Sequence, residues 1–177
     1  MKALATAILV GLALPSWAQH EGYAGQQGRE IKALSAEEVA QYLAGAGMGF
    51  AKSAELNHYP GPMHALELAD QLGLTGAQRE ATRKLMDAHK AEARALGAKV
   101  IVAEQALDAL FRKPQIAPSA LADAVAAAAS AQGAYRLSHL ETHRRMRALL
   151  TDEQVHRYDR ARGYTSSPRA GHSGHKH

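Results

Sequence analysis

The sequence predicts an all-α protein: an antiparallel hairpin of two long helices with shorter flanking helices. Apolar residues recur at spacings of three and four over two long stretches, and a proline-bounded turn separates these stretches. Aromatic residues make up only 5% of the chain while alanine is abundant, which favours closely packed helices over a β-sandwich. Because alanine-rich stripes bury little area per residue, we expect a homodimer to complete the core.

Residues 1–18 have the pattern of a cleavable secretory signal. Lys2 precedes an apolar run over residues 3–14, and residues 15–18 place small side chains at the two positions that a signal peptidase recognises. About twelve apolar residues are too few for the roughly 20 of a membrane-spanning helix. We therefore expect export and cleavage after Ala18.

Composition and charge exclude several classes of function. The chain has no cysteine, which excludes disulfides, thiolate metal sites and a cysteine nucleophile. A net charge of +4 is too small to indicate a nucleic-acid partner. There is no recognisable Ser-His-Asp arrangement, phosphate-binding glycine loop or His-Glu-x-x-His motif, so we expect no enzymatic activity.

The first half of the exported chain has weaker signals. Residues 19–34 are rich in Gly and Gln and predict a flexible lead-in. Ser35 and Glu38 form a capping box that opens a helix to about residue 55, and the glycines near residue 47 predict a break or a very close contact there. A turn over residues 57–62 leads into a short helix that Gly73 ends.

Two long helices follow. Thr75 and Gln78 form a second capping box, which opens a helix that continues to Lys113. Its predicted buried stripe is Ala81, Leu85, Ala88, Leu96, Val100, Ala103, Leu107 and Leu110. After a turn over residues 114–118, a helix from Ser119 to about Leu150 carries the stripe Leu121, Val125, Ala128, Gln132, Tyr135, His139, Thr142, Met146 and Leu149. A turn of five residues requires the two helices to lie antiparallel.

The chain ends with a third capping box and a histidine-rich tail. Thr151 and Gln154 open a last short helix that ends at Gly163. Residues 165–177 are rich in Ser, Pro, Gly and His and are predicted to be disordered. We therefore expect one helical domain over residues 35–164.

The motif Leu-Thr-x-x-Gln occurs twice, at residues 74–78 and 150–154, and the two copies bracket the helical hairpin. In this respect the chain resembles the Spy/CpxP group of periplasmic proteins and its relatives, the zinc-resistance-associated proteins and the nickel/cobalt sensors. The resemblance covers about residues 62–164. It implies a periplasmic, all-helical, often cradle-shaped dimer made in response to envelope or metal stress, whose members hold unfolding proteins without ATP, damp a sensor kinase or bind transition metals.

His139 and His143 are four residues apart, so on a helix they lie on one face, with Met146 one turn further along. This spacing lets one helix offer two imidazoles to a single Zn, Cu or Ni ion. The alternative is a pair of surface or hydrogen-bonded core histidines. The resemblance places metal ligands in this region, and His64, His89 or a dimer mate are the candidates to complete the set.

Three histidines of the tail, His172, His175 and His177, form a tract of the kind that chelates transition metals weakly; the alternative is an inert solvated end. Client binding would need apolar surface beside positive charge, for which Arg83, Arg94, Arg136 and Arg144 are the candidates. Their alternative is an ordinary solvated face.

These patterns lead to two hypotheses. The first is a periplasmic stress protein of the Spy/CpxP type, an ATP-independent chaperone that binds unfolded or misfolded periplasmic proteins and also binds a transition metal. The second is a heavy-metal sensor whose loaded and empty states differ in their grip on a membrane-bound signalling partner, such as a sensor kinase.

Overall fold

The computed structural model describes residues 22–165, and every regular element within that range is a helix. The helices are α1 (Ala36–Ala44), α2 (Lys52–Glu55), α3 (Pro62–Glu67), α4 (Ala69–Leu72), α5 (Gly76–Leu110), α6 (Pro118–Leu149) and α7 (Asp152–Arg162). The predicted all-α class is therefore confirmed for this part of the chain. Between residues 22 and 165, no helix has both the length and the apolar character to cross a membrane. The predicted signal segment and all but the first residue of the tail lie outside the described residues.

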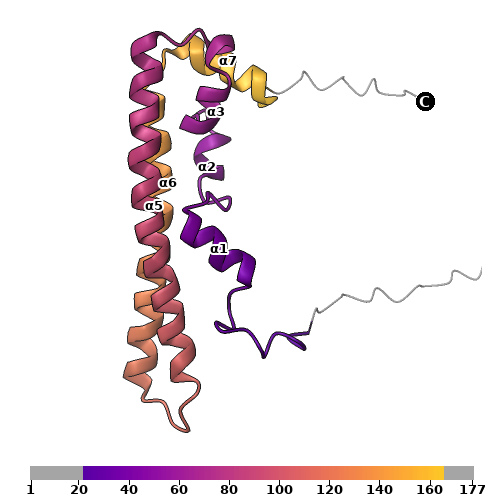
Figure 1. The fold of residues 1–177 in the computed structure, drawn as a ribbon, viewed down its shortest axis with the longest axis vertical. Coiled ribbons are helices and arrows are strands. Elements are labelled where there is room, and N and C mark those ends of the chain that lie inside the picture. The colour runs from indigo at the N-terminus through magenta and orange to yellow at the C-terminus, as the bar shows by residue number, and fades with distance from the viewer. Residues whose placement is uncertain (1–21, 166–177) are drawn as a thin grey trace, which may run out of the picture.

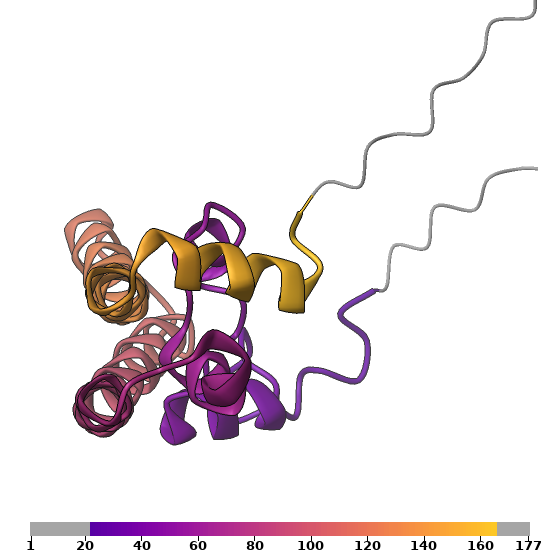
Figure 2. The ribbon, with the colours of Figure 1, turned by 90° about the horizontal axis from the view of Figure 1, so that it is seen from above.

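Helices α5 and α6 lie side by side and run in opposite directions, since the turn at residues 111–117 reverses the chain between them (Figure 1). Helix α5 ends three residues before the predicted Lys113, and α6 begins one residue before the predicted Ser119. Pro118 occupies the first turn of α6, where its missing N–H leaves no hydrogen bond unmade. The shorter helices all lie on the same side of the α5–α6 pair, and α7 runs from the end of α6 toward that side, where it contacts α4 (Figure 2).

All three predicted capping boxes are present. Ser35, Thr75 and Thr151 each accept a hydrogen bond from the backbone N–H three residues later. The side chain of that later residue in turn accepts from the cap's own N–H. Glycines with positive φ end α1, α4 and α7, as the sequence predicts for Gly73 and Gly163.

The predicted helix over residues 35–55 is broken at the glycines where the sequence predicts a break or a close contact, because Gly45 takes a left-handed conformation (φ 70°) and ends α1. The end of α1 packs closely on α5. A Cβ added to Gly97 would lie 2.7 Å from the carbonyl carbon of Tyr42, so the two backbones touch there. Residues 36–44 are thus part of the packed domain.

The packed region begins before the predicted boundary at Ser35. Ile31 is only 3% exposed and packs with Val100 and Tyr135. The backbone N–H of Lys32 donates to the Asp108 carboxylate at 3.1 Å. The prediction of a flexible lead-in over residues 19–34 is therefore corrected at its C-terminal end, where Ile31 and Leu34 pack against the same buried cluster. Two apolar residues are too few to reveal a helical period in the sequence.

The buried side chains form two clusters at different levels of the α5–α6 pair. One lies at the end near α7 and contains Ala65, Ala69, Leu72, Leu74, Leu85, Met146, Leu150, Val155 and Tyr158. The other lies further along and contains Ile31, Tyr42, Ala93, Val100, Ile101 and Tyr135. His89 of α5 and His139 and His143 of α6 lie between the residues that the two long helices give to these clusters.

The predicted stripes are partly correct. Leu85 and Val100 of α5 are buried, whereas Ala88 is exposed, and Ala93 and Gly97 are buried in its place. On α6, the stripe holds for Ala128, Tyr135, His139, Thr142 and Met146, but Val125 and Gln132 are exposed. Helix α5 is the main neighbour of α6, and Gln132 of α6 also donates to the Tyr42 hydroxyl of α1 at 3.4 Å.

Candidate metal centre

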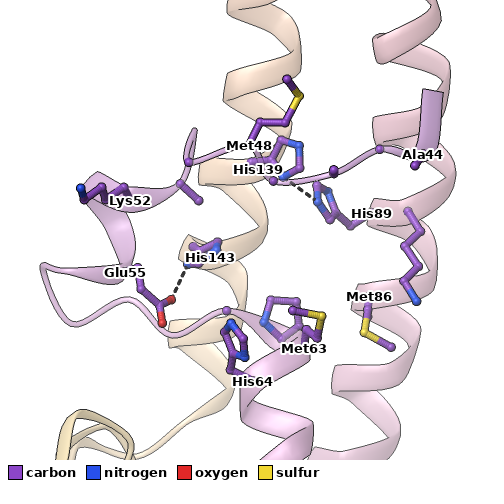
Figure 3. A pocket seen from close by; sticks show the side chains of 18 of the residues that line it. Ala44, Met48, Lys52, Glu55, Met63, His64, Met86, His89, His139 and His143 are labelled. Carbon is purple, nitrogen blue, oxygen red and sulfur yellow. Dashed lines mark hydrogen bonds and ion pairs between the residues drawn. The ribbon is translucent and has the colours of Figure 1, made fainter. Parts of the chain in front are cut away.

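A cavity of about 710 Å³ lies between the α5–α6 pair and the segment that joins α1 to α3. Its lining includes four of the six histidines in residues 22–165, His64, His89, His139 and His143, and three of the four methionines. Figure 3 shows these side chains converging from several elements. Helix α5 supplies His89 and Met86, α6 supplies His139 and His143, and the joining segment with α3 supplies the rest.

His89 and His139 form a hydrogen-bonded pair across the two long helices. Nε2 of His89 lies 3.0 Å from Nδ1 of His139, and the ring centroids are 4.5 Å apart (Figure 3). The remaining nitrogens, Nδ1 of His89 and Nε2 of His139, are buried and have no hydrogen-bond partner among residues 22–165. Buried polar atoms are rarely left unpaired, so this pair is available to a ligand.

Burial makes both rings neutral. The pKa of His139 falls to about 4, first because the ring is desolvated and then because His89 and His143 are close. Desolvation also lowers the pKa of His89, against the opposing effect of Glu92. In the neutral pair one ring donates to the other. Whichever ring donates, one of the two unpartnered nitrogens carries a proton and the other carries a free lone pair.

His143 presents a lone pair by a different route. Its Nδ1 lies 2.8 Å from the carbonyl oxygen of Tyr59, and a carbonyl can only accept, so Nδ1 carries the proton. In the neutral ring Nε2 is then unprotonated. A Cβ added to Gly61 would lie 3.2 Å from this nitrogen, so the glycine leaves it uncovered. Histidines that bind metals commonly donate their other N–H to a carbonyl or a carboxylate in this way.

His64 and Glu55 add two further donor atoms to the lining. Nδ1 of His64 donates to the Glu67 carboxylate at 2.8 Å, which leaves Nε2 of the neutral ring free. Oε1 of Glu55 accepts from the hydroxyls of Tyr158 and Tyr164, whereas Oε2 is buried and has no hydrogen-bond partner in the described part of the chain. The nearest ring nitrogen to Oε2 is Nδ1 of His143 at 3.6 Å (Figure 3).

The structure therefore brings together three of the predicted metal ligands, His64, His139 and His143, around one cavity. Met146 is not among them, because it is fully buried in the apolar cluster beside Leu85 and Tyr158. Within residues 22–165, no three side chains of His, Cys, Asp or Glu are close enough together to hold one ion as they stand. The tail histidines His172, His175 and His177 lie outside the described residues.

Sequence reasoning missed Glu55 and the three methionines Met48, Met63 and Met86. Each methionine lies in a different segment, and Met48 and Met63 have no histidine at helical spacing. Met86 precedes His89 by three residues on α5, a spacing that could have marked it. For Met48 and Met63, only the fold brings the sulfur atoms to the histidines. Burial of the lone acidic residue Glu55 likewise depends on Tyr158 and Tyr164, which follow it by about a hundred residues.

The four candidate arginines for client binding are all exposed but differ in their surroundings. Arg83 and Arg144 form ion pairs with Glu80 (3.9 Å) and Glu141 (2.6 Å) on their own helices. Arg94 and Arg136 have no carboxylate within 4 Å in the described part of the chain, and Arg94 lines the cavity. The structure does not gather the four into one patch around the cavity.

Comparison with known families agrees with the repeated motif. The family model described as LTXXQ motif family protein matches residues 62–162, which is more than half of the chain and includes both motif copies. No curated protein and no solved structure matches the chain. The chain therefore belongs to the LTXXQ motif family, the Spy/CpxP-type family of proteins.

Proposed function

We propose that this chain is an exported, periplasmic stress protein that binds a transition-metal ion in the cavity between α5, α6 and the α1–α3 segment. The observation that carries the proposal is the state of the histidines that line the cavity. Nδ1 of His143 donates to the Tyr59 carbonyl, and Nδ1 of His64 donates to the Glu67 carboxylate. In each neutral ring the other nitrogen, Nε2, therefore keeps a lone pair that can bind a metal ion.

The buried His89–His139 pair supports the same role. It keeps two neutral imidazoles at the cavity wall, with unpartnered nitrogens that water-exposed histidines would not have. Neutral imidazole is the form that binds Zn, Cu and Ni ions. Since the donors come from several elements, an ion bound here would tie the α1–α3 segment to the long helices.

The test is a metal titration of the full chain in a background of His172→Ala, His175→Ala and His177→Ala, which removes the tail as a competing chelator. Zn²⁺, Ni²⁺ and Cu²⁺ are titrated separately by isothermal calorimetry. We expect about one ion per subunit, and a loss of affinity of about 100-fold or more with His139→Ala plus His143→Ala. His156→Ala is the matched control, because His156 is exposed on α7 and does not line the cavity.

A second candidate function is ATP-independent binding of unfolded or misfolded periplasmic proteins. It is favoured by the exposed face of α6, where Val125 (49% exposed) and Arg136 are eleven residues apart, about three turns of one helix face. Apolar and cationic side chains on one face can contact many unfolded sequences without a fixed register. We propose the same face as the contact surface of the homodimer that the alanine-rich stripes predict.

Client binding is tested by suppression of aggregation of a denatured protein at a near-equimolar ratio, with and without metal. Failure under both conditions would exclude this activity. If suppression occurs, Val125→Ser plus Arg136→Glu should weaken it, whereas Arg144→Glu, whose partner is Glu141, should have a smaller effect.

The alternative role, a heavy-metal sensor acting on a sensor kinase, predicts instead that the metal-loaded and metal-free forms of the protein differ in affinity for a membrane-bound partner.

A further inference from the structure

The sulfur atoms of this domain are concentrated at the cavity. Met48 from the loop after α1, Met63 from α3 and Met86 from α5 all line it, and Met146 is the one methionine of residues 22–165 that does not. In Figure 3, Met48 lies near His139, while Met63 and Met86 lie toward the end of the cavity where His64 is placed. Thioethers and imidazoles thus line the same cavity.

This combination of donors has a definite metal preference. A thioether is a neutral, polarisable donor, and soft sulfur ligands select Cu(I) among the common transition ions. Zn²⁺ is bound mainly by thiolate, imidazole and carboxylate, and structural zinc sites are closed tetrahedra of four such ligands. The chain has no cysteine, so thioether is the only sulfur donor that it offers.

The spacing of the nitrogen and oxygen donors points the same way. No three of the His, Asp and Glu side chains in the described range stand close enough to form a site without rearrangement. A tetrahedral Zn²⁺ site would require four such ligands to be gathered. Cu(I) is satisfied by fewer ligands, so one or two imidazole nitrogens with thioether sulfur complete its shell.

We infer that the cavity is a Cu(I) site, in which thioethers from Met48, Met63 and Met86 act with one or two of the imidazole nitrogens that line it. This inference rests on the proposed metal-binding function and names its ion. The ion enters and leaves as Cu(I), so no electron transfer is involved. The carboxylate of Glu55 is a hard donor, which makes Zn²⁺ and Ni²⁺ the competing ions to be tested beside Cu(I).

The test measures Cu(I) affinity anaerobically, by competition with the chromophoric chelator bicinchoninate in excess ascorbate. It uses the full chain with the three tail histidines replaced by alanine. The test variant carries Met48→Leu, Met63→Leu and Met86→Leu. The matched control is Met146→Leu, which removes a thioether from the core, and circular dichroism checks that both variants fold, since Met-to-Leu exchange costs less than about 1.5 kcal/mol per site.

We expect the triple variant to lose about 100-fold in Cu(I) affinity, while its Zn²⁺ and Ni²⁺ affinities and the Cu(I) affinity of the control change less than about threefold. X-ray absorption of the Cu(I) protein should show Cu–S scattering that the triple variant lacks. Unchanged Cu(I) affinity in the triple variant, or no Cu–S scattering in the parent, overturns the inference. In that case histidine-dependent binding of Zn²⁺ or Ni²⁺ would leave the proposed function standing, whereas no binding of any ion would overturn both.

Discussion

The side chains of Gln78 and Gln154 donate hydrogen bonds to each other. Nε2 of Gln78 lies 2.8 Å from Oε1 of Gln154, and Nε2 of Gln154 lies 3.0 Å from Oε1 of Gln78. Gln78 also donates to the Leu149 carbonyl, and Gln154 to that of Gly73. Each motif glutamine therefore caps its own helix and satisfies a carbonyl just before the other motif, which joins the starts of α5 and α7.

This link predicts that the two glutamines are coupled in stability. Gln78→Ala or Gln154→Ala alone should lower the free energy of unfolding by about 1–3 kcal/mol, because each leaves a partly buried amide and a carbonyl without a partner. In the double variant the loss should fall short of the sum by about 0.5 kcal/mol or more. Urea unfolding of the four proteins measures this coupling, and strict additivity would contradict a direct link.

The helix starts were accessible from the sequence because a capping box is local. Thr75 and Gln78 determine the start of α5 within four residues, and the same holds for Thr151 and Gln154 at α7. The hydrogen bonds between the two glutamines were not accessible, since they join positions 76 residues apart. The glycines near residue 47 predicted either a break in the helix or a close contact, without deciding between them. The contact of Gly45 with Ala93 of α5 could not be predicted, because no local pattern identifies α5 as the partner.

Gly97 is predicted to be required for docking of α1. An added Cβ would lie 2.7 Å from the Tyr42 carbonyl carbon, so α1 must move away. Alanine gains about 1 kcal/mol of helix propensity over glycine, but overpacking costs about 1–3 kcal/mol, so Gly97→Ala should destabilise the fold on balance. Thermal unfolding measures the change in stability.

The matched control for Gly97→Ala is Gly133→Ala, because Gly133 lies in α6 with nothing within 4 Å of its added Cβ. This variant should be stabilised by about 0.5–1 kcal/mol. The two substitutions are chemically identical and should differ in sign. Equal effects at both positions would mean that α1 does not press on α5.

As with the fold, the part of the candidate site that depends on local spacing could be predicted from the sequence, and the part that depends on long-range packing could not. His139 and His143 share a helix face because they are four residues apart, and that relation was visible in the sequence. Met146 continues the same helix, yet one further turn takes it into the core beside Leu85. The methionines that line the cavity come from separate elements, and Met48 and Met63 reach it only because the segments after Gly45 and Gly61 pack beside the long helices.

Stability of the metal-free protein should fall as the pH falls from about 6.5 to about 4. The pKa of His139 is lowered to about 4 in the folded protein, chiefly by desolvation, against 6.5 for an exposed ring. Between these values the unfolded chain binds a proton that the folded protein does not, so the free energy of unfolding decreases with decreasing pH. The lowered pKa of His89 acts in the same direction.

Urea unfolding in the presence of a chelator, from pH 7.5 to pH 4, measures this dependence. His139→Gln should reduce the loss over that range by on the order of 2 kcal/mol, since glutamine does not titrate. Carboxylates such as Glu38, whose pKa is lowered by its bonds to Ser35, contribute only below about pH 4.5, so they leave the upper part of the window unaffected. An identical pH profile for parent and variant would show that His139 is not desolvated in the folded state.

Gly61 gives a way to block the site without removing a ligand. An alanine Cβ at this position would lie 3.0 Å from Cε1 and 3.2 Å from Nε2 of His143, and the backbone of Gly61 (φ −83°) is one that alanine adopts without strain. Gly61→Ala should therefore lower metal affinity about tenfold or more, by covering the free nitrogen or turning the ring. Its effect on stability should stay within about 1 kcal/mol, because the ring can shift by a few tenths of an ångström.

The matched control is Gly76→Ala, because no atom lies within 4 Å of the Cβ added there. Calorimetric titration of both variants should show unchanged metal affinity for Gly76→Ala. Equal affinities in the two variants would place the ion away from Nε2 of His143.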